Sequence, residues 1–273
     1  MSKVPASQRW SWMRRSRDSL QALLRCVMAI QINPYLIFRS LIALPRYIQA
    51  RRIFLKSSRS RDWPMELYPV LLDWGDESAN LGEYFWQDLY VAKRIIDEGP
   101  MRHVDVGSRV DGFIAHLACV RVVEIFDIRP LSSKIENVFF TQWDITKPHD
   151  DYIEISDCVS CLHTLEHLGL GRYGDGIDVE GWRKGLSSLA SLVRSGGGLW
   201  LSVPVGAQRV EFNAHRVFAP ATIRDEAIRH GLMISEFHYL QNQKLVRSES
   251  IEEDFMRLAG VRYALGIYHF RKI

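Results

Sequence analysis

The stretch HVDVGSRVDG (residues 103–112) decides the fold that we expect for this chain. Its first residues carry the β-branched pattern of a short strand. Gly107 follows as a turn residue, and a helical pattern then runs from Gly112 to Cys119. A strand, a glycine turn and a helix in direct succession begin a βαβ unit, so the stretch predicts a parallel sheet.

The pattern continues on both sides of this stretch. Six further strands are predicted at Val122–Ile128, Asn137–Gln142, Ile155–Cys161, Leu199–Val205, Leu232–Tyr239 and Arg262–Phe270. Further helices are predicted at residues 83–98, 179–193 and 219–230. Strands that alternate with helices in this way indicate an α/β fold, which is here a Rossmann-like, doubly wound, mostly parallel sheet of seven strands.

Composition and charge divide the chain into two parts. Its 273 residues are 47% hydrophobic and 25% charged, which is typical of a globular protein and excludes a disordered or collagen-like chain. Residues 1–62 contain 13 basic and 2 acidic residues, whereas residues 63–273 contain 22 basic and 30 acidic residues. We therefore expect a basic, helical N-terminal extension over residues 1–62 and a main domain over residues 63–273.

The extension is predicted to form amphipathic helices at residues 8–30 and 34–55, followed by a polar linker at residues 57–62. Either this arm packs on the main domain with a solvated basic face, or it adsorbs to an anionic membrane surface. A nucleic acid is the less favoured partner because of the apolar stripe. With no secretory signal and no apolar run long enough to cross a bilayer, we expect a cytoplasmic protein, with or without peripheral attachment to the inner membrane face.

Metal chemistry is not favoured by the sequence. Cys158 and Cys161 have C-x-x-C spacing, but no second cysteine pair exists, so we expect buried thiols. His163 and His167 are four residues apart, but the first ends a strand and no third ligand is apparent. We expect no metal site.

The ends of successive strands carry acids where a nucleoside would bind. In a doubly wound sheet, ligands lie at the carboxyl ends of the strands. Asp127 follows Gly107 by 20 residues, a spacing suited to ribose hydroxyls, and Asp144 after the next strand suits an adenine amino group. A nicotinamide dinucleotide requires G-x-G-x-x-G for its pyrophosphate, and that pattern is absent.

Several segments resemble the class I S-adenosylmethionine-dependent methyltransferases. Residues 105–112, 124–127 and 143–145 resemble their first three motifs, and residues 161–167 and 192–204 resemble the segments around their fourth and fifth strands. The resemblance covers residues 80–273 and implies S-adenosylmethionine as cofactor. It implies a cofactor site of Asp105, Gly107, Ser108, Gly112, Asp127, Ile128, Asp144, Ile145, Leu162 and His163. Arg109 and Asp111 replace two glycines of the usual first motif, so the chain departs from the family's pattern where the methionine end of the cofactor would lie.

Four blocks are similar to an uncharacterised bacterial methyltransferase-like family that accompanies capsule and O-antigen polysaccharide genes. They span residues 84–92, 103–113, 167–176 and 212–218. This resemblance implies O-methylation of a glycan or a lipid-linked polysaccharide intermediate. The alternative is a non-catalytic scaffold or partner protein in a membrane-associated glycan assembly complex, and the altered glycine motif favours it.

Methyl transfer to a hydroxyl group requires a base near neutral pH. Our first choice is His215, with His167 and Asp175 as second choices. For an acceptor such as a phosphate or a uronate, we expect binding by Arg172, Tyr173, Asn213 and Arg216. The glycine-rich loop at residues 169–176 is predicted to close over the substrate.

Overall fold

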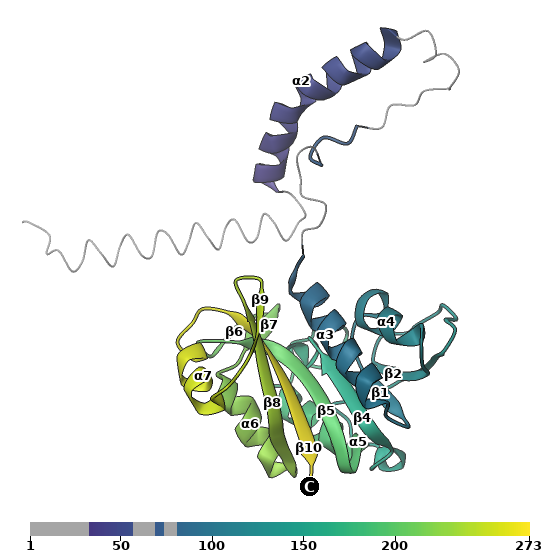
Figure 1. Ribbon diagram of the computed structural model, residues 1–273, viewed down its shortest axis with the longest axis vertical. Coiled ribbons are helices and arrows are strands. Elements are labelled where there is room, and N and C mark those ends of the chain that lie inside the picture. The colour runs from purple at the N-terminus through teal and green to yellow at the C-terminus, as the bar shows by residue number, and fades with distance from the viewer. Residues whose placement is uncertain (1–32, 57–68, 74–80) are drawn as a thin grey trace, which may run out of the picture. The chain divides into compact units, whose positions relative to one another are not determined.

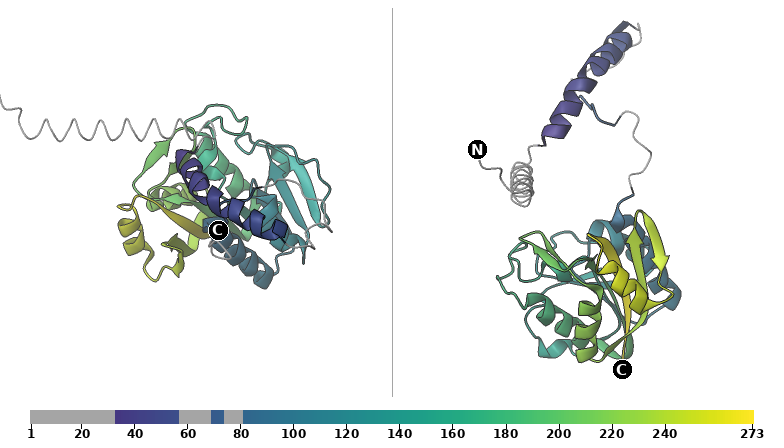
Figure 2. Two further views of the ribbon diagram at one scale, coloured as in Figure 1. Left: turned by 90° about the horizontal axis from the view of Figure 1, so that it is seen from above. Right: turned by 90° about the vertical axis from the view of Figure 1, so that its left-hand side faces the viewer.

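The chain divides into two compact units, Met1–Asn80 and Leu81–Ile273, in the computed structural model. The structure describes residues 33–56, 69–73 and 81–273. In the first unit, helix α2 spans Pro34–Lys56 and is one continuous helix (Figure 2), as predicted. The helix predicted at residues 8–30 and the linker at residues 57–62 lie outside the described residues.

Local sequence explains where α2 begins. The side-chain oxygen of Asn33 accepts hydrogen bonds from the backbone N–H groups of Tyr35 and Leu36, at 3.1 and 3.3 Å, which makes it the N-cap. Pro34 at the first helical position needs no such partner. No residue of α2 is buried, and Leu41 and Ile42 are each 63% exposed.

The second unit contains an eight-stranded sheet with the order β3-β2-β1-β4-β5-β10-β8-β9 (Figure 1). Its strands are β1 (His103–Val106), β2 (Val123–Asp127), β3 (Val138–Gln142), β4 (Ser156–Leu162), β5 (Val193–Val205), β8 (Leu232–Gln241), β9 (Lys244–Arg247) and β10 (Ala264–Lys272). Strands β1 to β5 pair in parallel, and β10 runs antiparallel between β5 and β8. The predicted mostly parallel, Rossmann-like sheet is confirmed.

The prediction of seven strands was one short. Strand β9 pairs with β8 through a hairpin whose turn residues, Asn242 and Gln243, have φ angles of 51° and 59°. Such turns usually carry glycine at the second position, and this one does not, so it has little local signal in the sequence. The short hairpin of β6 (Arg209–Glu211) and β7 (His215–Val217) forms a separate two-stranded sheet and was also not predicted.

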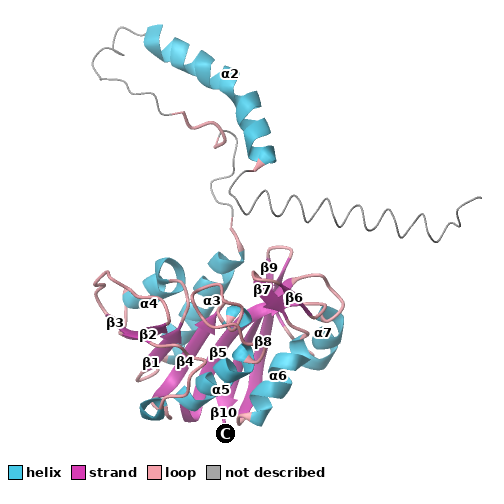
Figure 3. Cartoon of the chain, turned by 180° about the vertical axis from the view of Figure 1, so that it is seen from behind, coloured by secondary structure: helices cyan, strands magenta, loops and turns pink. Residues whose placement is uncertain are grey.

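Helices cover both faces of the large sheet. On one face lie α3 (Glu83–Glu98), a π-helical turn (Val110–Ile114) and α4 (Ala115–Ala118); on the other lie α5 (Gly181–Leu192), α6 (Pro220–Arg229) and α7 (Ile251–Leu258). Figures 1 and 3 view the unit from opposite sides, with α3 over the sheet in the first and α5 and α6 over it in the second. Helix α7, with only eight residues, was not predicted.

The alternation of side chains along β5 builds two cores. Leu199 and Leu201 face the α5 side, and Trp200 between them faces the α3 side; all three are fully buried. Burial of each such side chain stabilises the fold by about 1.5–3 kcal/mol. This packing fixes the sheet and therefore the ends of its strands. None of the helices in the described residues is both long and apolar enough to cross a membrane.

Candidate functional site

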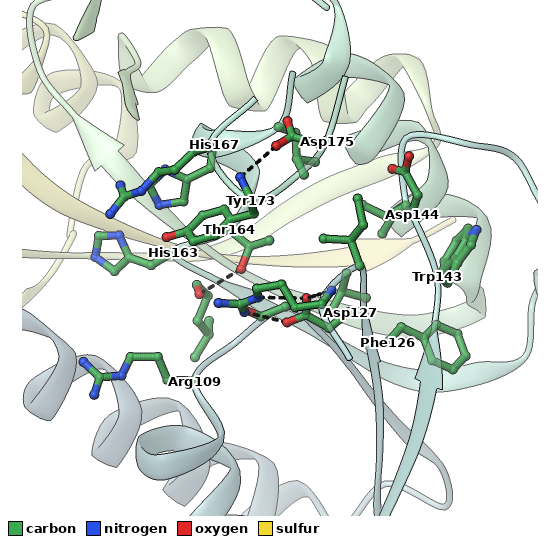
Figure 4. Close-up of a pocket in the computed structure, with 18 of the residues that line it drawn as sticks. Arg109, Phe126, Asp127, Trp143, Asp144, His163, Thr164, His167, Tyr173 and Asp175 are labelled. Atoms are coloured by element: carbon green, nitrogen blue, oxygen red, sulfur yellow. Dashed lines mark hydrogen bonds and ion pairs between the residues drawn. The ribbon is translucent and has the colours of Figure 1, made fainter. Parts of the chain in front are cut away.

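A cavity of about 340 Å³ lies at the carboxyl ends of β1, β2, β3 and β4 (Figure 4). This is where ligands bind in doubly wound folds. Its walls come from the loops after these four strands and from Tyr84 of α3. It is lined by Tyr84, Val106, Gly107, Arg109, Phe126, Asp127, Ile128, Arg129, Trp143, Asp144, Ile145, Leu162, His163, Thr164, His167, Leu168, Arg172, Tyr173 and Asp175.

Of the ten residues expected to bind the cofactor, seven line this cavity: Gly107, Asp127, Ile128, Asp144, Ile145, Leu162 and His163. The other three, Asp105, Ser108 and Gly112, do not line it. Their positions have separate physical reasons.

Asp105 is fully buried and holds the loop after β1 from inside. Its carboxylate accepts hydrogen bonds from the hydroxyl groups of Ser108 and Ser160, at 2.7 and 2.6 Å. The Ser108 oxygen in turn accepts the backbone N–H of Leu162 at 3.1 Å, which joins the loop to the end of β4. Burial raises the pKa of Asp105 to about 7 although the serine hydrogen bonds oppose this shift.

The two glycines of this loop serve different purposes. Gly107 has a φ of 72°, and a Cβ there would lie 2.5 Å from the Thr164 side chain at the cavity wall. Gly107 is therefore required by its own backbone conformation and by the packing of Thr164 against this loop. At Gly112, an added Cβ would collide with the carboxylate of Asp88 on α3, so this glycine serves helix packing and does not face the cavity.

One end of the cavity suits a flat, polar-edged ring. Phe126, Trp143 and Asp144 lie together there in Figure 4, and Ile145 adds an apolar wall. One oxygen of Asp144 accepts the backbone N–H and the hydroxyl group of Thr146, at 3.1 and 2.7 Å. Burial alone would raise the pKa of Asp144, but these bonds and Lys147 lower it, so the carboxylate is ionised at neutral pH.

Asp127 lies between the two ends of the cavity and is paired with Arg129. Arg129 Nη2 lies 2.5 Å from one carboxylate oxygen, and Arg129 Nε lies 3.0 Å from the other. The Asp127 side chain is 12% exposed and the Arg129 side chain 47%. Arg129 was not among the predicted site residues, although a basic residue two positions after the strand-end acid was a visible signal.

Arg109, which replaces a glycine of the usual first motif, lines the cavity. Its guanidinium is held 2.7 Å from Asp111 and lies 5.3 Å from the centre of the Tyr84 ring. Partial burial raises the pKa of Tyr84 to about 12, so its phenol stays neutral. Tyr84, like Thr164 and Trp143, was not among the predicted site residues.

A buried ion pair lies at the other end of the cavity. His163 Nδ1 is 2.7 Å from Glu166 Oε1, and His163 Nε2 is 3.6 Å from Glu83. Burial lowers the pKa of His163, but Glu166 and Glu83 outweigh it and raise the pKa overall. Burial likewise acts against ionisation of Glu166, whose pKa is nevertheless lowered by His163 and His167.

His167 belongs to the same cluster and lines the cavity. Its Nδ1 lies 2.7 Å from the backbone oxygen of Ala214. Since a carbonyl only accepts, Nδ1 carries the proton and Nε2 is left as the acceptor nitrogen. Burial lowers the pKa of His167, so the ring is neutral at pH 7 and has the form of a general base.

Three residues predicted at the site, all in the β6–β7 hairpin, do not line the cavity. Asn213 is exposed at its turn, and His215 Nε2 lies 3.7 Å from Glu211. Arg216 is buried and donates to the backbone oxygens of Leu168, Glu166 and Val179, at 2.6, 3.3 and 3.4 Å. These bonds fix the loop after β4, so Arg216 serves structure and is not free for an anion.

The glycine-rich loop contributes the remaining predicted residues. Asp175 lines the cavity, but its carboxylate accepts the backbone N–H groups of Gly169, Tyr173 and Gly171, at 2.7, 3.1 and 3.3 Å. It therefore holds the loop's shape. Arg172 lines the cavity and lies 5.1 Å from the centre of the Tyr173 ring.

The chain's cysteines and acids do not form a metal centre within the residues that the structure describes. Cys158 and Cys161 are both buried in the core, 3% and 1% exposed. Burial raises the pKa of both thiols, which disfavours the thiolate form.

Solved structures of other proteins share this architecture. The [4+2]-cyclase SpnF superposes with a TM-score of 0.50 at 14% identity, covering 73% of this chain and 86% of that one. The N-methyltransferase NodS from Bradyrhizobium japonicum WM9, in complex with S-adenosyl-L-homocysteine, has a TM-score of 0.48 at 14% identity, over 71% and 89% of the two chains. The 1,6-didemethyltoxoflavin-N1-methyltransferase of Burkholderia thailandensis, with S-adenosylhomocysteine, has a TM-score of 0.48 at 15% identity, over 84% and 90%. At these identities the likeness concerns the fold alone.

Sequence comparison gives the family. No curated protein matches the chain. A family model described as "Caenorhabditis protein of unknown function, DUF268" matches residues 122–258, from β2 to α7. The matched segment contains every strand-end acid and histidine that lines the cavity. The chain belongs to this family.

Proposed function

We propose that the protein is an S-adenosylmethionine-dependent methyltransferase. The observation that carries the proposal is the alignment of Asp127 and Asp144 along one cavity, beside the apolar wall of Phe126, Trp143 and Ile145. A carboxylate placed for ribose hydroxyls and another placed for an amino-bearing ring are what an adenosyl ligand requires. The similar solved structures that hold S-adenosylhomocysteine are consistent with this ligand.

The residues at the cavity are suited to this cofactor. Gly107 brings backbone to the wall where a side chain would strike Thr164. Asp127 and Asp144 would hold the adenosine half, and Arg109 and Tyr84 would border the methionine half. The bound cofactor supplies an electrophilic methyl group on a sulfonium sulfur. The protein's own part is to orient the acceptor, exclude water and take up a proton.

We propose His167 as the group that takes up this proton. It is neutral, its tautomer is set by Ala214, and its free Nε2 is an acceptor. Glu166 lies 3.6 Å from Nε2 and would stabilise the imidazolium that forms. Asp175 was the other second choice, but its carboxylate is occupied by three backbone N–H groups. His215, our first choice from sequence, does not line the cavity.

The proposed acceptor is a glycan or a lipid-linked polysaccharide intermediate. This part rests on the resemblance of four sequence blocks to a family associated with polysaccharide genes. Tyr173 and Arg172 at the cavity provide the aromatic and cationic groups that a sugar acid or sugar phosphate would contact. The alternative is a non-catalytic scaffold in a membrane-associated glycan assembly complex, supported by Arg109 and Asp111 in place of glycines.

Calorimetric titration with S-adenosylhomocysteine tests the proposal. We expect binding by the wild type and about tenfold weaker binding by Asp127→Asn, which loses the charge that ribose hydroxyls contact. Asp254→Asn is the matched control, because Asp254 also pairs with an arginine, at 2.7 Å, but lies on α7 away from the cavity. A wild type that does not bind refutes the proposal. Binding without methyl transfer to polysaccharide extracts favours the scaffold.

We also propose that residues 1–62 attach the protein to an anionic membrane surface. Helix α2 supports this, because it carries five basic and no acidic residues together with exposed apolar side chains such as Phe38 and Leu41. Flotation with phosphatidylglycerol vesicles tests it. We expect the full chain to float, and a chain that lacks residues 1–62 to stay in solution. Equal flotation of both refutes it, and a shift of RNA that depends on these residues favours nucleic acid.

A further inference from the structure

The Asp127 carboxylate has little capacity left for a ribose. Its Oδ1 accepts the backbone N–H of Arg129 at 2.8 Å and Arg129 Nε at 3.0 Å, and its Oδ2 accepts Nη2 at 2.5 Å. A carboxylate oxygen has two lone pairs, so Oδ1 is saturated and Oδ2 has one position free. For two neighbouring ribose hydroxyls to donate to this carboxylate, one to each oxygen, the Arg129 guanidinium must therefore leave Asp127.

The guanidinium that leaves Asp127 already has another contact. Arg129 lies 4.9 Å from the centre of the Tyr173 ring, and Arg172 lies 5.1 Å from the same centre. Arg172 donates to the backbone oxygen of Ala214 at 2.9 Å, which carries no formal charge. Once Asp127 binds a ribose, the guanidinium groups of Arg129 and Arg172 lie over the Tyr173 ring with no carboxylate paired to Arg129. An oxyanion that bridges them removes the repulsion between their like charges and makes charge-assisted hydrogen bonds to both.

We infer that Arg129 and Arg172 form an oxyanion site for the acceptor, which is completed when the cofactor's ribose displaces Arg129 from Asp127. The inference rests on the proposed function and deepens it. It makes the acceptor a carboxylate or a phosphate ester, and it makes binding ordered, with the cofactor first. By thermodynamic linkage, the cofactor and the anion raise each other's affinity by the same factor.

The chain contains a matched control for Arg129. On α7, Arg257 pairs with Asp254 at 2.7 Å and lies 4.8 Å from the centre of the Tyr239 ring. The Arg257 side chain is 44% exposed, against 47% for Arg129. This second acid–arginine–tyrosine group does not line the cavity. Arg257→Gln thus removes the same kind of ion pair as Arg129→Gln without touching the site.

The displacement step is tested by calorimetric titration of the full chain with adenosine, which has the ribose but no carboxylate. We expect Arg129→Gln to bind adenosine about fivefold more tightly than the wild type, because a partly exposed ion pair no longer competes. Arg257→Gln is expected to bind as the wild type does. Unchanged or weaker binding by Arg129→Gln overturns this inference alone. A wild type that binds neither adenosine nor S-adenosylhomocysteine overturns the proposed function as well.

The anion step is tested with glucuronate and glucose 1-phosphate as probes and glucose as the neutral control. We expect saturating S-adenosylhomocysteine to raise the affinity of the wild type for one of the two anions at least about fivefold, and not its affinity for glucose. The probe that responds distinguishes a carboxylate from a phosphate. Arg129→Gln should lose this gain, and Arg257→Gln should keep it. If neither anion responds to the cofactor product, or if Arg129→Gln keeps the gain, the oxyanion site is refuted.

Discussion

Asp105 and Asp127 belong to neighbouring parallel strands, yet their surroundings are opposite. Asp105 is fully buried among serine hydroxyls, whereas Asp127 lines the cavity. The register of β1 and β2 explains the difference, because Val106 pairs with Phe126. Asp127 is thus level with Gly107, and Asp105 lies two residues back inside the sheet. Distance along the strand, and not merely an acid near its end, decides which carboxylate meets a ligand.

His167 and His215 form a second such pair. Both were expected to reach the acceptor, but only His167 lines the cavity. The hairpin that holds His215 also holds Arg216, and in a strand consecutive side chains point to opposite faces. Arg216 is buried against the loop after β4, so His215 points the other way, toward Glu211 and Tyr263.

The largest difference between the His167 and His215 sites is expected in the rate of catalysis. His167→Gln should lower the turnover number about 10²–10³-fold, because in the proposed reaction the acceptor hydroxyl loses its base. His215→Gln should change the rate less than about threefold, since that ring lies away from the cavity. The measurement is transfer of labelled methyl groups to polysaccharide extracts, with unfolding curves to establish that both variants fold. A greater loss for His215→Gln than for His167→Gln would reverse our assignment.

Removal of Asp105 is expected to cost stability. Asp105→Ala leaves the hydroxyl groups of Ser108 and Ser160 and the N–H of Ser108 without their acceptor in a dry interior. We expect the free energy of unfolding to fall by about 2–3 kcal/mol in urea denaturation. As a comparison, Ser248→Ala removes one part-buried donor to Asp254 and should cost about 1 kcal/mol. Equal losses of unfolding free energy would show that the Asp105 hydrogen bonds stabilise the fold no more than a single part-buried hydrogen bond does.

Much of this arrangement followed from periodicity and spacing. The strand and helix pattern predicted the parallel sheet, and the helix at residues 83–98 ends where Gly99, with a φ of 59°, lets the chain turn. The sequence did not predict where side chains point when their partners lie far away along the chain. Arg216 contacts backbone oxygens about 37–50 residues away. Gly112 is required because a side chain there would collide with Asp88 of α3, and not because of a ligand. Such contacts depend on tertiary packing and produce no periodic pattern in the local sequence.

The pH dependence of stability sharpens the contrast between the two acids. Burial raises the pKa of Asp105 from 3.8 to about 7 in the folded protein. Between these values the folded state holds a proton that the unfolded state has released, so the contribution of Asp105 to stability falls as pH rises from about 4 to about 7. We therefore expect the unfolding free energy of the wild type, relative to that of Asp105→Asn, to fall as pH rises across this range. Urea denaturation at several pH values measures this difference. A pH-independent difference would contradict the raised pKa.

The smallest effect is expected for the stability of Asp127→Asn. Its ion pair with Arg129 is half open to water, since the arginine side chain is 47% exposed, and solvent screening leaves such a pair worth about 0–1 kcal/mol. The unfolding free energy of Asp127→Asn should lie within about 1 kcal/mol of the wild type in the same urea experiment, while its affinity for S-adenosylhomocysteine falls about tenfold. That separation is what distinguishes an acid that faces a ligand from one that holds a loop. A stability loss as large as that of Asp105→Ala would place Asp127 in the scaffold instead.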